Sequence, residues 1–569
     1  MQKSFRFLAG AIFILAMSIN LFAQSHQMYL KTPTAVTYIN KIIMGDTLSN
    51  GKRADVDRVY VLQRGGVWFF NDVIKNIGWD VRIQAEDVAG PLPIIYGTVA
   101  NNSTTVPIDF IDSQGSVYIK NLVINGISDF DPDYRLWKYA APRELIVWNV
   151  SGNYTLNVDG CILLHAYQAD LRTFSGIRSI KVTNTIFANS GTGTYDNMGD
   201  GRAVDLRKTS CDSLIMYNNT FVNGQDRPIR HISSTASLNF MVFEHNTVVN
   251  NGGRYGVIAL GMLGKDTKIQ IKNNLFLDPM TFGADTASQR QFDFLESKES
   301  FSSTIKNKAN HVMIYHQRDT TATSIDNTLK FDISNNQYAF TTEIQNTWKT
   351  INAWNPTLKM PSVLSNFIQS KVSANAFTKV DPFAFTKVPK PMTGLVTWNL
   401  SPLPEGAGEN SSGGSKFQDM DRRPTTYYRD TLNCSYATTL PAYTAGTKSY
   451  PLGDLNWFPT KKTAWLAAGG WTSVEKTNSE IPTSFNLDQN YPNPFNPTTK
   501  ISYSIPKASQ VRLEIYDILG SRIETLVNNM QNAGNYNVDF DASKYSSGVY
   551  IYRLITSDYT ISKKMMLMK

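Results

Sequence analysis

The stretch MYNNTFVNGQ, Met216–Gln225, places asparagines on both sides of a short apolar segment. Asparagine is a poor strand former, but it tolerates the left-handed backbone conformation that a sharp bend requires. A short strand with asparagine at each end is therefore expected to lie between two bends of the chain.

Related phrases return along the chain, mostly at intervals of about 24 to 39 residues, which are typical of repeat architectures. Each phrase follows or contains a short segment with alternating apolar residues, such as IKVT, LIMY, MVFE or IQIK, the pattern of a strand with one buried face. The phrases are KNLVIN, DGCILL, TNTIFAN, NNTFVN, HNTVVN, NNLFLD and NNQYAF, which end at Asn125, Leu164, Asn189, Asn223, Asn250, Asp278 and Phe340.

One coil of strands per repeat predicts an all-β fold, a right-handed parallel β-helix over residues 32–340. Repeat units bury their apolar faces by stacking on their neighbours. We expect asparagine amides to bond from coil to coil in an internal ladder at one corner. The predicted ladder consists of Asn184, Asn219, Asn246 and Asn274, with Phe187, Phe221, Val248 and Phe276 nearby in the core.

The composition bounds the class of partner. The chain has 569 residues and a net charge of +8, without a run of lysine and arginine of the kind that tracks phosphates. Nucleic acid is therefore not indicated, whereas the basic balance is compatible with an acidic polymer as ligand. Three cysteines do not make a disulfide framework, although a pair between Cys211 and Cys434 remains open. Cys161 occupies a repeat position and is expected to be buried.

Residues 1–23 combine a basic start with the apolar run FLAGAIFILAMSINLFA, which predicts a secretory signal peptide cut between Ala23 and Gln24. Later segments lack the apolar length of a membrane span. We therefore expect a mature protein without a membrane span, monomeric, and either secreted or held at the outer cell surface.

The remaining chain divides into two parts. Residues 341–478 are rich in proline, tryptophan, tyrosine and asparagine, and are predicted to form closing coils and an irregular tail of the helix domain. Residues 481–569 contain alternating strand patterns separated by proline, glycine and asparagine turns, which predict a small β-sandwich.

Four motifs near the end of the chain carry a resemblance: YPNPFNPTTKI, DILGSRI, SSGVYIYRL and the terminal KKMMLMK. They resemble the type A C-terminal sorting domain of the type IX secretion system. The resemblance implies export across an outer membrane by the type IX secretion machinery, followed by release or attachment at the surface. It implies nothing about the chemistry of the rest of the chain.

Two similar segments, ADLRTFS (Ala169–Ser175) and VDLRKTS (Val204–Ser210), are candidates for a functional surface. Aligning them places Asp170 over Asp205 and Arg172 over Arg207, with the intervening leucines directed into the core. Neighbouring strands add four more polar residues to this face, giving a charged cleft across three or four coils. These are Arg227, Arg230 and His231 from RPIRHIS, and Glu144 from RELIVWN.

This charged face has two interpretations. Acidic and basic ladders can simply pair with each other and keep the surface soluble, because surface ion pairs contribute only about 0–1 kcal/mol each. Alternatively, the face can cleave a uronate polymer by β-elimination, which requires a neutralised carboxylate and a base that reaches the neighbouring proton. Calcium or arginine can supply the neutralising charge.

The segment DGRAVDLRKTSCDSLIMYNNTF (Asp200–Phe221) is similar to the calcium-bearing coil of secreted pectate lyases, and RPIRH resembles their arginine-proline segment. The resemblance implies that Asp200 and Asp205 bind Ca²⁺, and that Arg227 or Arg230, beside Arg207, serves as base and substrate clamp. Substrate would then contact Arg172, His231, Asp170 and Glu144.

Two functions remain open at this stage. One is a calcium-assisted polysaccharide lyase that acts on uronate-containing, pectate-like glycans. The other is a noncatalytic surface protein that uses the same face for glycan binding or adhesion. The sequence does not name the polymer.

Overall fold

The computed structural model describes most of the chain. The described residues are 26–33, 37–99, 105–127, 141–191, 201–207, 209–232, 237–253, 257–260, 263–281, 312–314, 328–350, 376–394, 396, 428–468, 470, 485–490, 493–506, 509–531, 534–556 and 559–569. The predicted signal peptide, residues 1–23, lies outside them. Among the described residues, no helix has the length and apolar character needed to cross a bilayer.

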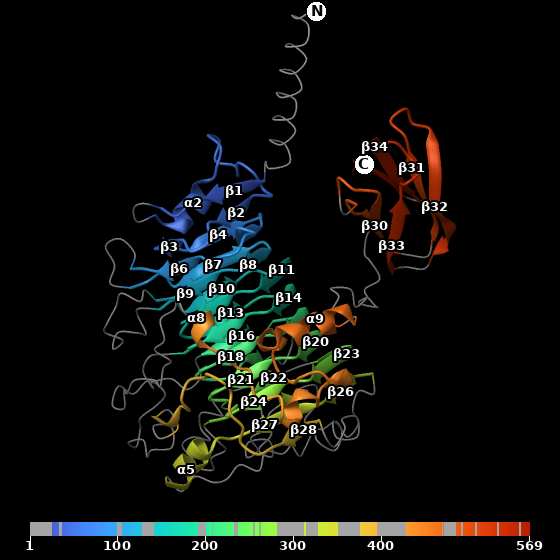
Figure 1. Cartoon of the computed structure of the whole chain (residues 1–569). Coiled ribbons are helices and arrows are strands. Elements are labelled where there is room, and N and C mark those ends of the chain that lie inside the picture. The colour runs from blue at the N-terminus through green and yellow to red at the C-terminus, as the bar shows by residue number, and fades with distance from the viewer. Residues whose placement is uncertain are drawn as a thin grey trace, which may run out of the picture. The chain divides into compact units, whose positions relative to one another are not determined.

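Three long sheets of parallel strands form the first unit of the chain, as Figure 1 shows. Successive strands along the chain enter different sheets, and each pairs with the strand one coil away. This topology is a parallel β-helix, as the repeated phrases predicted.

The first sheet has ten strands among the described residues, and its outer face includes many polar side chains. Its strands are β1 (Gln27–Leu30), β2 (Val59–Leu62), β5 (Val81–Ala85), β8 (Val117–Lys120), β11 (Gly152–Asp159), β14 (Ile177–Thr183), β17 (Cys211–Tyr217), β20 (Leu238–Glu244), β23 (Leu263–Lys272) and β26 (Lys330–Ser334).

The second sheet has eight described strands and carries the charged residues discussed below. Its strands are β4 (Ile74–Ile77), β7 (Asp109–Gln114), β10 (Glu144–Trp148), β13 (Ala169–Thr173), β16 (Arg202–Arg207), β19 (Ile229–Ile232), β22 (Ile258–Leu260) and β25 (Val312–Ile314).

The third sheet has ten described strands, most of them the apolar segments that the asparagines bracket. Its strands are β3 (Val67–Phe70), β6 (Ile94–Gly97), β9 (Val123–Asn125), β12 (Ile162–Leu164), β15 (Ile186–Ala188), β18 (Thr220–Val222), β21 (Thr247–Val249), β24 (Leu275–Leu277), β27 (Asn336–Ala339) and β28 (Phe377–Lys379).

The predicted stack of core residues is confirmed. Phe187 pairs in register with Phe221, and their rings stack with centroids 5.0 Å apart. Val248 and Phe276 continue the same row on β21 and β24. All four side chains are buried, so the interior is packed from coil to coil and leaves the outer faces for ligands.

The asparagine ladder exists, with one correction to its membership. The ladder contains four buried residues: Asn219, Asn246, Asn274 and Asn336. The Nδ2 group of each of the first three donates to the side-chain Oδ1 of the next, at 3.0, 3.2 and 2.8 Å. The prediction for Asn184 is wrong, because Asn184 takes the preceding position, which has a positive φ of 55°, while Thr185 occupies the ladder position.

A second row of asparagines marks the other end of each bracketed strand. Asn189, Asn223 and Asn250 have φ between 52° and 56° and bond from coil to coil through their side chains. The phrase NNTFVN thus places asparagine at two bends, where its tolerance of left-handed backbone and its amide are both used.

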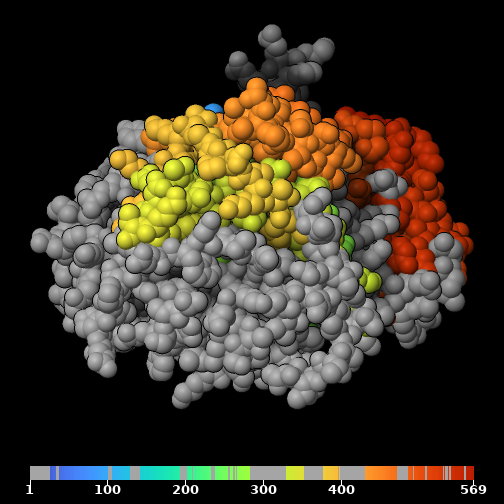
Figure 2. Space-filling view, turned by 90° about the horizontal axis from the view of Figure 1, so that it is seen from below, coloured from blue at the N-terminus to red at the C-terminus, as the bar shows by residue number. Residues whose placement is uncertain are grey.

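Short helices accompany the coils: α2 (Ile39–Gly45), α5 (Thr342–Thr350), α8 (Tyr428–Thr431), α9 (Pro459–Ala467) and the 3₁₀ helices η4 (Pro441–Tyr443), η5 (Thr447–Ser449) and η6 (Leu455–Trp457). Ile39 of α2 and Trp348 of α5 belong to the interior cluster. Residues 376–394 and 428–468 meet through a bridge between Lys387 and Asn433, and Figure 2 shows both on one face of the molecule.

The three cysteines are free and buried, so the possible pair between Cys211 and Cys434 is wrong. Cys211 belongs to the interior cluster of the coils, whereas Cys434 packs in a separate cluster with the outward side of the third sheet. Cys161 takes the ladder position that Thr185 takes one coil later, and its side chain is buried, as predicted.

The second unit, Leu466–Lys569, contains two antiparallel sheets packed around one core, which confirms the predicted sandwich. One sheet contains β29 (Asn486–Leu487), β30 (Thr498–Ile505) and β33 (Gly534–Asp541). The other contains β32 (Arg522–Gln531), β31 (Ser509–Tyr516), β34 (Gly548–Ile555) and β35 (Thr560–Leu567).

Candidate functional site

The middle strands of the eight-stranded sheet bring charged side chains together on the side away from the core. Arg172 on β13, Asp205 on β16 and Arg230 on β19 are register partners on successive coils. Their inward neighbours Leu171, Leu206 and Ile229 belong to the core. Alternation along each strand therefore separates a charged row from an apolar row.

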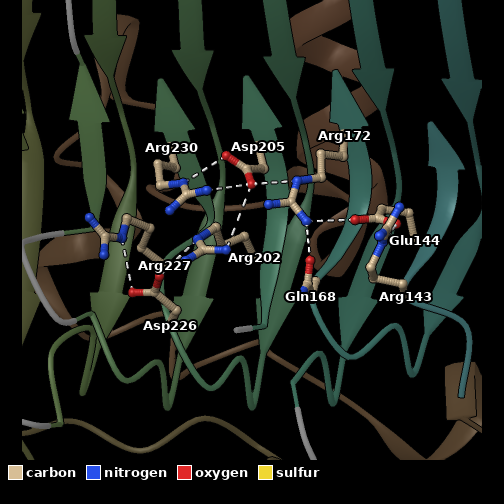
Figure 3. A network of polar contacts seen from close by, with 9 residues as sticks. All are labelled: Arg143, Glu144, Gln168, Arg172, Arg202, Asp205, Asp226, Arg227 and Arg230. Carbon is tan, nitrogen blue, oxygen red and sulfur yellow. Dashed lines mark hydrogen bonds and ion pairs between the residues drawn. The ribbon is translucent and has the colours of Figure 1, made fainter. Parts of the chain in front are cut away.

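Asp205 is the centre of this network (Figure 3). Arg230 donates to its two oxygens at 2.7 Å each, the Nε of Arg172 lies 3.0 Å from Oδ2, and Nη1 of Arg202 lies 3.7 Å from it. Burial alone would raise the pKa of Asp205, but the charges of Arg230, Arg202 and Arg172 outweigh it and hold the pKa well below its usual range.

Two further carboxylates extend the network on either side of Asp205, as Figure 3 shows. Glu144 accepts from Nε of Arg143 and from Nη1 of Arg172, both at 2.6 Å. Asp226 accepts from Nε of Arg202 at 3.0 Å and from Nε of Arg227 at 2.9 Å. Gln168 also accepts a hydrogen bond from Arg172.

Asp109 is a fourth acid and carries a proton near neutral pH. It pairs in register with Glu144 on the neighbouring coil and is buried. Burial, followed by the hydrogen bond to Glu144 and the charge of Glu144, raises the pKa of Asp109 to about 8. Two adjacent carboxyl groups that are shielded from water cannot both ionise without a large cost in free energy.

The described network is rich in positively charged side chains. Five arginines, Arg143, Arg172, Arg202, Arg227 and Arg230, contact three carboxylates, Glu144, Asp205 and Asp226. Burial and the charge of Arg230 lower the pKa of Arg202 to about 9, which still leaves it charged at pH 7. Arginines thus outnumber the carboxylates that they contact in Figure 3, and Asp112 lies beside Asp109 at one end of the network.

Three residues at the edge of the network reach solvent, and we call them the rim: Arg143, Phe174 and Arg207. Phe174 is 37% exposed, the Arg143 side chain is 30% exposed, and Arg207 is exposed. The guanidinium carbons of Arg172 and Arg143 lie 4.7 and 6.0 Å from the centre of the Phe174 ring. The rim thus combines cations with an exposed aromatic face.

The predicted alignment of the two DLR segments is wrong. Arg172 lies opposite Asp205, and Leu171 lies opposite Val204, so the matching letters are two residues out of phase. Asp170 is consequently buried apart from Asp205, where it accepts from Oγ of Ser190 at 2.5 Å. Burial raises the pKa of Asp170 to about 8.

The other predicted site residues fall into three groups. The first group lies in the network or on its rim: Glu144, Arg172, Asp205, Arg227, Arg230 and, on the rim, Arg207. His231 is buried in register with Leu206 and Leu260, and its Nε2 lies 3.2 Å from the carbonyl oxygen of Thr209. Asp200 lies outside the described residues.

The sequence interpretation missed four members of the network: Asp109, Arg143, Arg202 and Asp226. Each lies at or beside the start of a strand of this sheet or in the bend before it, where strand alternation does not yet indicate direction.

Asp205 does not fit the predicted role of a calcium ligand. Ca²⁺ prefers six to eight oxygen ligands, but the oxygens of Asp205 face three guanidinium groups. Among the described residues, the grouping with metal-ligand spacing is His26, Asp55 and Asp57, outside this network.

Residues 489–568 match the family described as the secretion system C-terminal sorting domain. The match covers nearly the whole described sandwich. The protein is therefore exported by type IX secretion, to the cell surface or beyond it, and its sandwich interacts with the secretion machinery. Comparison with the curated proteins gave no match.

Proposed function

We propose that this exported β-helix protein binds an acidic, uronate-containing polysaccharide on the outer face of its eight-stranded sheet. The observation that supports this proposal is the cluster of five arginines on this face, which outnumber the carboxylates that they contact. Charges in a poorly solvated environment act over a longer range than charges in water, so the network attracts an anionic chain.

The stacking of the coils suits a polymer. Parallel strands lie about 4.8 Å apart, so equivalent side chains repeat at that interval along the helix axis. Carboxylates repeat similarly along a polyuronate. Arg143 precedes β10 and Arg207 ends β16 two coils later, so a chain that meets both would cross the strands diagonally.

The rim provides the direct contacts in this proposal. Arginine binds carboxylate through two parallel hydrogen bonds, which suits Arg143 and Arg207. An exposed aromatic ring can stack on the apolar face of a sugar, which suits Phe174. Arg172, Arg202 and Arg230 are buried, so they contribute charge and hold the surface in place.

A second candidate function is β-elimination on the same glycan, and the lowered pKa of Arg202 favours it. In this reaction a base removes the C5 proton next to the uronate carboxylate while nearby cations neutralise that carboxylate. A double bond forms between C4 and C5, the glycosidic C4–O bond breaks, and the leaving oxygen takes a proton from water. Arg202 would serve as the base in this candidate, which requires its side chain to leave Asp226 and reach the substrate. Arg227 and Arg230 would then supply the neutralising charge.

Binding is tested by calorimetry with polygalacturonate, alginate and chondroitin sulfate, with neutral dextran as the comparison. The double variant Arg143→Gln/Arg207→Gln should bind the acidic polymer about tenfold more weakly, or about 1.4 kcal/mol. Arg178→Gln is the matched control, because Arg178 is an exposed arginine of β14 on a different sheet. Equal binding of dextran, or an unaltered double variant, would contradict the proposal.

Elimination is tested separately by the ultraviolet absorbance of unsaturated products, with and without chelator. A signal that Arg202→Lys removes, while glycan binding persists, would support the second candidate. If none of the three acidic polymers gives the signal, elimination is dropped and the binding proposal stands on the calorimetry.

A further inference from the structure

The sorting sandwich presents two apolar side chains to solvent at the tip of its β31–β32 hairpin. Ile518 is 72% exposed and Leu519 is 88% exposed, the highest values for large hydrophobic residues in the described part of the chain. By contrast, the apolar residues of β31 that precede the tip are buried in the sandwich core: Val511, Leu513 and Ile515.

The turn that carries this tip is well ordered by its own hydrogen bonds. Oδ1 of Asp517 accepts from the backbone N–H groups of Leu519 and Ser521, at 2.9 and 2.8 Å. Gly520, with φ of 85°, donates its N–H to the carbonyl oxygen of Asp517 at 3.1 Å. Ile518 and Leu519 are therefore held outward in a fixed geometry, which lowers the entropy cost of binding through them.

Cationic side chains lie on the outer face of the sheet behind the tip. Arg512, Arg522 and Arg553 surround Glu514 on β31, β32 and β34, and exposed Lys564 on β35 lies opposite Ile551. Arg522 lies opposite Tyr516, at the end of β31 next to the tip. Four cations facing one carboxylate give this face a positive charge that an acidic partner surface complements.

We propose that Ile518 and Leu519 form the element by which the type IX secretion machinery captures this domain. The two side chains enter an apolar pocket on a protein of the machinery, and acidic residues around that pocket meet the face formed by Arg512, Arg522, Arg553 and Lys564. The match of residues 489–568 to the sorting domain requires that some surface of this sandwich is recognised. The tip is its most exposed apolar feature.

A protein pocket fits this tip better than a membrane surface. A single myristoyl chain binds a bilayer only marginally and reversibly. The side chains of one isoleucine and one leucine contain fewer carbons than that chain. A pocket can enclose both side chains, and burying each contributes about 1.5–3 kcal/mol.

The test measures export of the full chain in a cell that has type IX secretion, as the ratio of extracellular or surface protein to retained protein. The double variant Ile518→Ser/Leu519→Ser should lower this ratio at least tenfold. Ile518→Val/Leu519→Met, which keeps the tip apolar, should restore it. Ile77→Ser is the control, because Ile77 is 66% exposed on β4 and lies outside the residues that match the sorting domain.

A second variant, Arg522→Glu/Lys564→Glu, should also lower export because it reverses two charges of the cationic face. Thermal unfolding of the purified chains checks that each sandwich remains folded. Export of both double variants at the wild-type level would overturn the proposal. The proposal would also be overturned if the wild-type chain bound anionic lipid vesicles and the Ile518→Ser/Leu519→Ser variant did not. The tip would then bind a membrane and not a protein pocket.

Discussion

Arg230 donates its Nε–H and one Nη2–H to the two oxygens of Asp205 from the neighbouring coil, each over 2.7 Å. Because the strands are parallel and in register, this pair can form only if one coil stacks directly on the next. The bidentate pair fixes the orientation of Arg230 and uses both oxygens of the aspartate. It therefore links the coiled fold to the charge of its outer face.

Asp205→Asn should destabilise the β-helix strongly. The substitution leaves Arg172, Arg202 and Arg230 buried without their shared counterion, and breaking a buried pair in this way costs about 3–5 kcal/mol. The free energy of unfolding of the helix unit in urea measures the loss. Asp332→Asn is the control, because Asp332 pairs with Lys272 at the surface and its loss should cost about 0–1 kcal/mol.

Lowering the pH should remove the stability that the ion pairs of Asp205 contribute. The pKa of Asp205 is lowered in the folded state, so its stabilisation is present above the pKa of an unfolded aspartate, about 3.9, and is lost as pH falls through the folded value. Wild-type protein should lose stability below about pH 4 more steeply than Asp205→Asn. Parallel curves for the two proteins would contradict the assignment.

Glycan affinity should fall as pH rises through about 8. Asp109 has a raised pKa of about 8, so it is neutral below that pH and becomes a carboxylate above it, beside Glu144, Asp112 and Arg143. Its ionisation adds a negative charge beside the arginines. The same ionisation is unfavourable for folding, because a raised carboxyl pKa gives stability that is lost as pH rises through the folded value.

Asp109→Asn provides the comparison for this pH dependence, since the amide keeps a hydrogen-bond donor for Glu144 and has no titration. Calorimetric affinity for polygalacturonate between pH 6 and 9 should decline more in the wild type than in the variant. Identical profiles would show that Asp109 does not control the charge of the network.

Asn246→Ala should destabilise the helix by about 3 kcal/mol, because it leaves the buried N–H of Asn219 without its acceptor. Asn246→Thr should cost less, about 1 kcal/mol, since the Thr185 hydroxyl already accepts the N–H of Cys161 at the equivalent ladder position. Urea unfolding measures both. Equal losses would mean that the side-chain acceptor does not matter there.

The three thiols should be unreactive in the folded protein. Burial raises the pKa of Cys211 to about 12, and Cys161 and Cys434 are also buried. A thiol reagent at pH 8 should therefore label none of them until denaturant is added, and then all three. A disulfide in the purified protein would leave only one thiol to label after denaturation without reductant.

The fold could be predicted from the sequence because asparagine bends and alternating strands repeat with every coil. Phe187, Phe221, Val248 and Phe276 were placed correctly because each lies between two asparagine positions of its phrase. The relation between coils was harder to predict, because turn lengths differ. Register offsets change by one residue between β13–β16 and β14–β17, so identical letters such as DLR need not align.

The site was partly predictable for the same reason. Alternation indicated that Arg172 and Asp205 point outward. It gave no direction for Arg202 or Asp226, which lie beside bends. Nor could a sequence pattern indicate that Asp205 pairs with several arginines, because those arginines come from three coils. Calcium was expected from residue type, while the contacts of Asp205 suit an anion-binding surface.

Protection of individual arginines tests the proposed glycan surface most directly. The folded protein is treated with an arginine-selective dicarbonyl reagent, with and without saturating polygalacturonate, and the modified positions are read by mass spectrometry. Arg143 and Arg207 should become protected by the polymer, while Arg178 on the ten-stranded sheet should react equally in both conditions. Equal modification of Arg143 and Arg207 with and without polymer would contradict binding at this face.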